Sequence, residues 1–258
     1  MNDLYFQNIK ENINNLFSGS NSNVTLFGPT NSGKSYILLG SPQEDGILRR
    51  SIRDILNKID LNKRINQNHS FVLSMVAYQI VNSQIYDILS RNKNSEVFLN
   101  KDYYEEFQAQ LTKYDMYTMK DLDNMDIDIH KSSLNSCVVV SLQLDKISNL
   151  RENVNQRESY SQVDFIELPS SQYGLPKGDM KIYNHDAEDG TLFKTVNNVF
   201  NSLYNNIVSS AVNLNPTYES LLTLVMKPTI NPESNITFIT CILPCELSSF
   251  ESEKALKV

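Results

Sequence analysis

Gly28-Pro-Thr-Asn-Ser-Gly-Lys-Ser35 is the stretch that decides the fold of this chain, because it matches the complete phosphate-loop pattern G-x-x-x-x-G-K-S/T. Such a loop needs a strand that delivers it and a helix whose first turn points free amides at an anion. The apolar run 24–27 precedes the loop, and the helix-compatible run 36–39 follows it. The sequence therefore predicts a strand, a phosphate-binding loop and a helix in direct succession.

The residues of this loop have separate roles in holding a nucleotide. Gly28 and Gly33 let the backbone curl around a phosphate. Lys34 is expected to reach the β- and γ-phosphates, and the Ser35 hydroxyl is expected to bind Mg²⁺. The predicted nucleotide contacts are Gly28, Pro29, Thr30, Asn31, Ser32, Gly33, Lys34, Ser35 and Tyr36.

Composition favours a single globular domain in a reducing compartment. The chain has 258 residues, 40% of them hydrophobic, and no apolar run approaches the roughly 20 residues that span a bilayer. Three cysteines cannot build a disulfide framework, and the N-terminus has no signal-like core. A formal charge of −7 disfavours non-specific binding to nucleic acid. We therefore expect a cytoplasmic protein with neither a nucleic-acid nor a membrane partner.

The order of apolar patterns predicts an α/β fold, with a central mostly parallel or mixed sheet and helices on both faces. One acidic stretch, 100–131, has eight Asp and Glu against four Lys, and we interpret it as a surface excursion. Helices are expected at 5–17, 47–59, 190–210, 217–226 and from about 248, and strands at 24–27, 71–80, 137–144, 162–168 and 235–243.

The segments after the loop resemble, in order, those of the kinesin motor domain. The loop with its flanks, FGPTNSGKSY, is similar to the kinesin YGQTGSGKTYT, and 46–56, GILRRSIRDIL, is similar to GIIPRAIRDIF. Residues 132–136, SSLNS, occupy the place of the switch I motif SSRSH. Residues 165–172, FIELPSSQ, occupy the place of switch II, VDLAGSE. Further matches in order are 76–89, 196–207, 214–225 and 234–244.

This resemblance implies one kinesin-like P-loop NTPase domain over residues 1–258. It implies ATP or ADP with Mg²⁺ as ligands, and microtubules, or another protein partner, on the cytoskeleton. The family's first strand, with its adenine-contacting segment, and its neck have no counterpart in the sequence. By position, Glu167 is the candidate acid near Mg²⁺, and Ser133 is a candidate switch I hydroxyl.

The switches depart from the family pattern at three positions. Leu134 stands where switch I has an Arg, and Gln172 stands where switch II has its Glu partner. Ser170 replaces the Gly whose amide senses the γ-phosphate. Because such electrostatic groups are worth about 10²–10³-fold in rate, we expect a domain that binds ATP but hydrolyses it poorly. The alternatives are an active divergent motor whose switches are misaligned, and an unrelated P-loop small-molecule kinase.

The expected track-binding segment, 214–226, contains no Lys or Arg and includes Glu219. Because tubulin is strongly acidic, this composition predicts weak attachment to microtubules.

Overall fold

The computed structural model describes residues 2–29, 31–65, 68–81, 84–91, 95–97, 104–123, 136–149, 155–169, 221–230, 233–243 and 252. The helix expected at 190–210 lies outside these residues, as does nearly all of the helix expected from about 248.

The N-terminal quarter forms the loop-bearing unit and its supporting helices. The elements are α1 (Asn2–Leu4), the π-helix η1 (Tyr5–Ile9), α2 (Lys10–Phe17), β1 (Ser22–Phe27), α3 (Lys34–Leu39), β2 (Gly40–Ser41), β3 (Glu44–Asp45) and α4 (Ile47–Ile65). All six residues of β1 are buried, as expected for a strand covered on both faces. The predicted strand–loop–helix succession is confirmed.

The rest of the described chain completes the sheet. The elements are β4 (His69–Val81), β5 (Gln84–Asp87), β6 (Ser95–Val97), α5 (Tyr104–Gln110), β7 (Tyr114–Met116), α6 (Met119–Asp123), β8 (Cys137–Asn149), β9 (Asn155–Glu167), α8 (Leu221–Met226) and β10 (Asn235–Thr240). Helix α8 forms the described part of the helix expected at 217–226. The described helices include none that is long and apolar enough to cross a membrane.

The described strands form an eight-stranded mixed sheet in the order β10-β1-β9-β8-β4-β5-β6, with β7 pairing to β4, and a separate β2–β3 ladder. Strand β1 is parallel to both β9 and β10, whereas the other pairings in the large sheet are antiparallel. The expectation of a mixed sheet is thus confirmed, with its parallel part confined to the three strands around the loop. That arrangement brings the carboxyl ends of β1, β9 and β10 to one edge.

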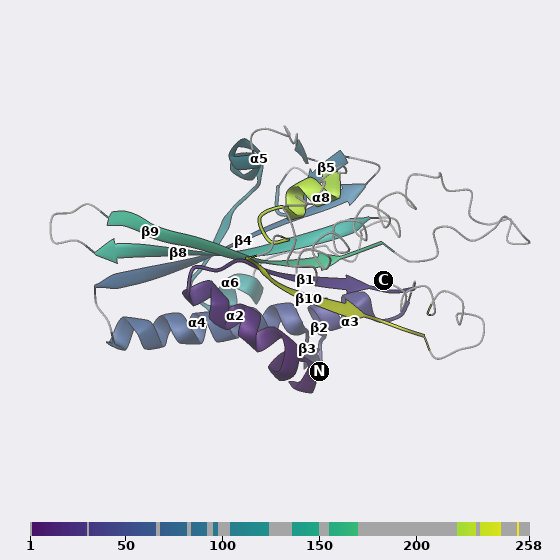
Figure 1. Ribbon diagram of the computed structural model, residues 1–258, viewed down its shortest axis with the longest axis horizontal. Helices are drawn as coiled ribbons and strands as arrows, with labels where there is room; N and C mark the ends of the chain where they lie inside the picture. Colours follow the sequence, from purple (N-terminus) through teal and green to yellow (C-terminus); the bar gives the residue numbers. More distant parts are fainter. Residues whose placement is uncertain are drawn as a thin grey trace, which may run out of the picture.

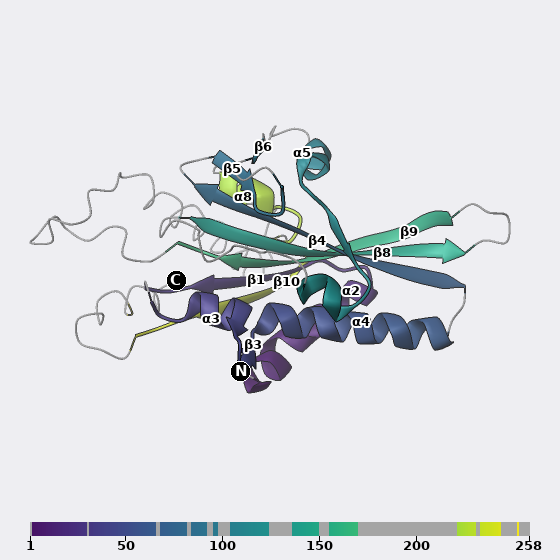
Figure 2. The ribbon, with the colours of Figure 1, turned by 180° about the vertical axis from the view of Figure 1, so that it is seen from behind.

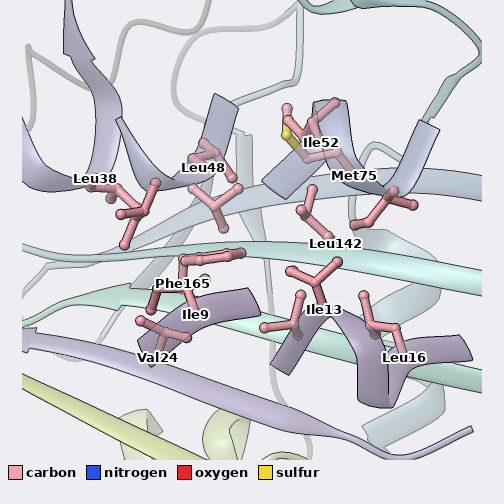
Figure 3. Packing of buried hydrophobic residues seen from close by; sticks show 14 of the residues in the cluster. Ile9, Ile13, Leu16, Val24, Leu38, Leu48, Ile52, Met75, Leu142 and Phe165 are labelled. Atoms are coloured by element: carbon pink, nitrogen blue, oxygen red, sulfur yellow. The ribbon is translucent and has the colours of Figure 1, made fainter. Parts of the chain in front are cut away.

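Helices cover both faces of the sheet (Figure 1; Figure 2). Helices α2, α3, α4 and α6 lie on one face, and α5 and α8 lie on the other. Each face has its own apolar core. Figure 3 shows the first, in which Ile13 of α2 and Ile52 of α4 pack toward Leu142 and Phe165 of the sheet. The second core contains Leu222 and Val225 of α8.

Part of the segment expected as a surface excursion, 100–131, belongs to the sheet. Its described residues, 104–123, place β7 against β4, with Leu73 opposite Met116. Phe107 and Met116 are buried although the segment is acidic. Apolar residues spaced among the acids therefore anchor this segment.

Candidate functional site

The phosphate loop runs from the end of β1 to the start of α3, and its backbone requires glycine at two positions. At Gly28, where φ is +148°, an added Cβ would lie 2.1 Å from the carbonyl oxygen of Cys241. At Gly33, the N-cap of α3, φ is +93°, in the region that side chains rarely adopt. Asn31 also has a positive φ of 60°. The loop is therefore tightly curled, as the motif predicts.

Lys34 lies beneath the loop with its ammonium group turned back onto it. Its side chain is buried, and Nζ donates to the carbonyl oxygens of Gly28 and Pro29, each at 2.9 Å. Burial lowers the pKa of Lys34, and the nearby Glu167 carboxylate acts in the opposite direction. The amide of Ser32 donates to Pro29 and closes a turn of the loop. The cation is thus held at the centre of the loop.

Ser35 and Glu167 meet at the start of α3. The Ser35 hydroxyl donates to Oε1 of Glu167 at 2.6 Å. This contact follows from the sheet, because β9 is parallel to β1 with Glu167 in register with Leu26. The pair offers a hydroxyl and a carboxylate, the hard oxygen ligands that Mg²⁺ prefers while it keeps several waters and phosphate oxygens. These residues therefore fit a Mg²⁺ ion held jointly with a nucleotide.

Cys241 lies against the phosphate loop, although no sequence motif points to it. It follows β10, its amide donates to the Phe27 carbonyl at 2.7 Å, and its own carbonyl packs against Gly28. Cys241 and Cys137 are both buried and free, as the cysteine count predicts. The position of Cys241 could not be predicted, because sequence motifs do not reveal which strands pair with β1.

A pocket of about 740 Å³ opens next to Tyr36, beyond the phosphate loop. Its lining residues are Tyr36, Ser41, Pro42, Gln43, Glu44, Asp45 and Arg50. The Tyr36 hydroxyl donates to Glu44 at 2.8 Å, and Arg50 Nε donates to the Asp45 carbonyl at 2.8 Å. A half-exposed aromatic ring and fixed polar groups therefore flank the loop on one side.

Several predicted site residues lie outside the described part of the chain. Among the predicted nucleotide contacts this holds for Thr30, and among the switch positions it holds for Ser133, Leu134, Ser170 and Gln172. The structure thus brings together the phosphate loop, Tyr36 and Glu167. Within the described residues, no group of three or more His, Cys, Asp or Glu forms a separate metal site.

Comparison with known proteins identifies related sequences along the whole chain. The family model of the kinesin motor domain matches residues 1–258. The kinesin-like protein KIF22-A of Xenopus laevis is 21% identical over 98% of this chain, and kinesin-related protein 1 of Dictyostelium discoideum is 22% identical over 96%. The chain spans only 40% and 12% of the lengths of these two relatives.

Solved structures share the fold at low identity. The Drosophila kinesin family member NOD, in complex with AMPPNP, has a TM-score of 0.73 and 19% identity, covering 99% of this chain and 78% of its own. KIF14, with AMP-PNP and in complex with a microtubule, has a TM-score of 0.78 and 18% identity, covering 98% of this chain and 74% of its own.

Proposed function

The chain belongs to the kinesin motor-domain family, and on that premise we propose that it binds Mg²⁺-ATP and microtubules but hydrolyses ATP poorly. The observation that carries the proposal is the placement of Glu167 2.6 Å from Ser35, beside the phosphate loop. Because the chain belongs to the kinesin family, the alternative of an unrelated small-molecule kinase is excluded. We further propose a single domain over residues 1–258, acting on the cytoplasmic cytoskeleton.

The loop geometry supports ATP as the ligand. A phosphate chain can take the two hydrogen bonds that Lys34 Nζ now gives to the Gly28 and Pro29 carbonyls. The carbonyls are neutral acceptors, whereas a phosphate oxygen is negatively charged, so the exchange pairs the Lys34 ammonium with an opposite charge and favours binding. The related NOD structures contain AMPPNP in one case, and manganese with ADP in another.

Ser35 and Glu167 are the residues that would hold Mg²⁺. The ion, when bound, neutralises phosphate charge. The protein orients the Ser35 oxygen by its hydrogen bond to Glu167. Relative to the Asp of the family motif, Glu167 adds one methylene, which the register with Leu26 accommodates at hydrogen-bonding distance.

The pocket beside Tyr36 supports a place for the nucleoside. A nucleotide whose phosphates occupy the loop must extend its sugar and base outside it. The Tyr36 ring offers a face for a base, and the carboxylate of Glu44 accepts hydrogen bonds from hydroxyl or amino groups. We therefore place the nucleoside against Tyr36 and the β2–β3 ladder.

Poor hydrolysis is proposed from the sequence of the switches. With Leu134 and Gln172, both charges of the family's switch salt bridge are replaced by neutral side chains. Losing both partners together avoids a stranded buried charge, so the fold tolerates the change. The transition state, however, loses electrostatic support that a kinesin uses for catalysis.

Weak attachment to microtubules is proposed from charge. Helix α8, the described end of the segment 214–226, contains no basic residue, and Lys227 follows it. KIF14 and NOD are both described in microtubule complexes. Because attraction to acidic tubulin is screened by salt, we expect binding that is measurable only at low ionic strength.

Steady-state ATPase and cosedimentation assays test this function. We expect turnover at least about 100-fold below that of a conventional kinesin, with little stimulation by microtubules. We expect pelleting with microtubules at low salt and release at physiological salt. Fast, microtubule-stimulated turnover would support the alternative of an active divergent motor and would contradict the proposal.

A further inference from the structure

A buried polar network surrounds Asp164, on the face of the sheet that is opposite to Glu167. Side chains alternate along a strand, so Asp164 and Glu167 of β9 point to different faces. Asp164 is only 1% exposed. It lies on the face covered by α8, because Ile166, two residues further along β9, packs in the same core as Leu222 and Val225 of α8. The role of this acid is therefore separate from the proposed Mg²⁺ site.

The Asp164 carboxylate receives hydrogen bonds from the turn after α8 and from its own strand. Thr229, in the turn after α8, donates its hydroxyl to Oδ2 at 2.7 Å. Gln162 Nε2 lies 3.3 Å from Oδ1 and 3.2 Å from Oδ2. Behind Thr229, the Asn23 amide donates to its Oγ1 at 3.2 Å, and Thr25 donates to Asn23 at 2.6 Å.

The groups that face Asp164 from the described elements are uncharged. Strand β1 contributes Asn23 and Thr25, and β9 contributes Gln162. Strand β8 places Ser141 directly opposite in register. Among the described residues, the titratable Tyr160 enters this network through Gln162, to which its hydroxyl donates at 2.6 Å. The ionisation of Asp164 is therefore governed by burial and by neutral donors.

The Thr229 hydroxyl has one proton and two acceptors within reach. Besides Asp164, its Oγ1 lies 3.2 Å from the carbonyl of Met226, the last residue of α8. When Asp164 is ionised, its carboxylate accepts the hydrogen bond from this hydroxyl. A protonated Asp164 can instead donate to Thr229 Oγ1, and the Thr229 proton is then free to turn to Met226. Both arrangements satisfy the hydroxyl, so protonation selects between two hydrogen-bonded states.

We propose that Asp164 and Thr229 form a pH-sensitive hydrogen-bond switch that joins β9 to the C-terminal end of α8. Burial raises the pKa of Asp164 to about 6, and the nearby hydroxyls of Ser141 and Thr229 and the amide of Gln162 counteract part of that rise. Near neutral pH, Thr229 donates its hydroxyl proton to a hydrogen bond with Asp164. On mild acidification, Asp164 donates to Thr229, and the Thr229 hydroxyl donates to the Met226 carbonyl at the end of α8. The switch is independent of nucleotide and acts on the helix within the expected track-binding segment.

Carbon-13 NMR of the whole chain between pH 4.5 and 8 tests this switch. We expect the Asp164 carboxyl to titrate with a midpoint near pH 6, and the Thr229 side-chain signals to follow the same midpoint. Thr229→Val removes the donor and should raise the midpoint by about one pH unit, a tenfold change in proton affinity. Thr229→Ser keeps the hydroxyl and should leave it unchanged.

Three results would overturn the proposal: an Asp164 midpoint near pH 4, Thr229 signals that do not follow Asp164, or an unchanged midpoint in Thr229→Val. The first two are read on the unmodified protein, so they do not depend on whether a variant folds.

Discussion

Glu167 and Asp164 are acids on the same strand, yet β9 gives them opposite surroundings. Glu167 lies at the carboxyl end, where a parallel neighbour brings it to Ser35 and near Lys34. Asp164 lies under α8 among neutral donors. One acid therefore faces a cation and a phosphate loop, while the other is buried among uncharged groups of the described elements. Because side chains alternate along β9, the strand places the proposed Mg²⁺ ligand on one face of the sheet and the proposed pH-sensitive contact on the other.

The phosphate loop packs closely against the residue that follows β10, and Gly28→Ala should disturb this packing more than any other change. Its new Cβ would lie 2.1 Å from backbone of Cys241, which cannot yield as a flexible side chain would. We expect a loss of about 3 kcal/mol or more in stability, measured by denaturant unfolding. Gly33→Ala is the matched control, because its Cβ meets nothing within 4 Å and only its φ is strained. Gly33→Ala should lower the free energy of unfolding by about 1 kcal/mol. An equal loss of stability in the two variants would contradict the role of packing at Gly28.

Lys34→Ala should remove the central cation of the loop face. We expect ATP affinity to fall at least about 100-fold in calorimetry, because the phosphates lose charge-assisted bonds. The exposed Lys63→Ala, on α4, should bind ATP as the unmodified chain does. Tight ATP binding by Lys34→Ala would place the nucleotide elsewhere.

Glu167→Gln tests whether this acid serves the metal. The variant keeps an acceptor for Ser35 but loses the charge, so Mg²⁺ should support ATP binding about tenfold less well. Glu158→Gln, on the same strand but paired with Lys146, serves as the control. An unchanged Mg²⁺ dependence in Glu167→Gln would remove this residue from the metal site.

Asp164→Asn tests the other face through pH. Asp164 has a raised folded pKa of about 6 against an ordinary value of 3.8, so folding takes up a proton between these values. The folded state therefore loses stability as pH rises through this window. Between pH 5 and 7.5, the folded-to-unfolded ratio should fall about tenfold more in the unmodified chain than in Asp164→Asn. The exposed Asp60→Asn is the control and should lose stability with pH as the unmodified chain does. If the stability of Asp164→Asn also falls with pH as much as that of the unmodified chain, the raised pKa of Asp164 is contradicted.

Tyr36→Ala probes the nucleoside end of the site. We expect ATP to bind about tenfold more weakly, whereas inorganic tripolyphosphate, which lacks a nucleoside, should bind unchanged. Tyr117→Ala, a similarly exposed tyrosine on another segment, is the control. Equal weakening of both ligands would mean that Tyr36 shapes the loop and not the nucleoside pocket.

The sequence predicts the loop face better than the rest of the sheet. The motif singles out Gly28 and Lys34, and the family resemblance points to Glu167 as a candidate. The full lengths of β8 and β9 were missed, because their outer halves are polar. Lys146 of β8 pairs with Glu158 of β9 at 2.8 Å, and such cross-strand ion pairs extend a ladder without an apolar signal.

Contacts between distant segments were also beyond the sequence. Nothing in the local pattern says that Cys241 will close against Gly28, or that Thr229 will reach Asp164. Both contacts depend on which strands become neighbours of β1 and β9. The antiparallel pairing of β4, β5 and β8 could not be predicted either, because an apolar run in the sequence is compatible with a strand of either direction.

Measuring ATP binding and ATP turnover on one preparation tests the central claim most directly. The proposed function predicts Mg²⁺-dependent binding that Lys34→Ala abolishes, together with turnover at least about 100-fold below that of a conventional kinesin. Turnover comparable to a conventional kinesin, or no ATP binding at all, would contradict it.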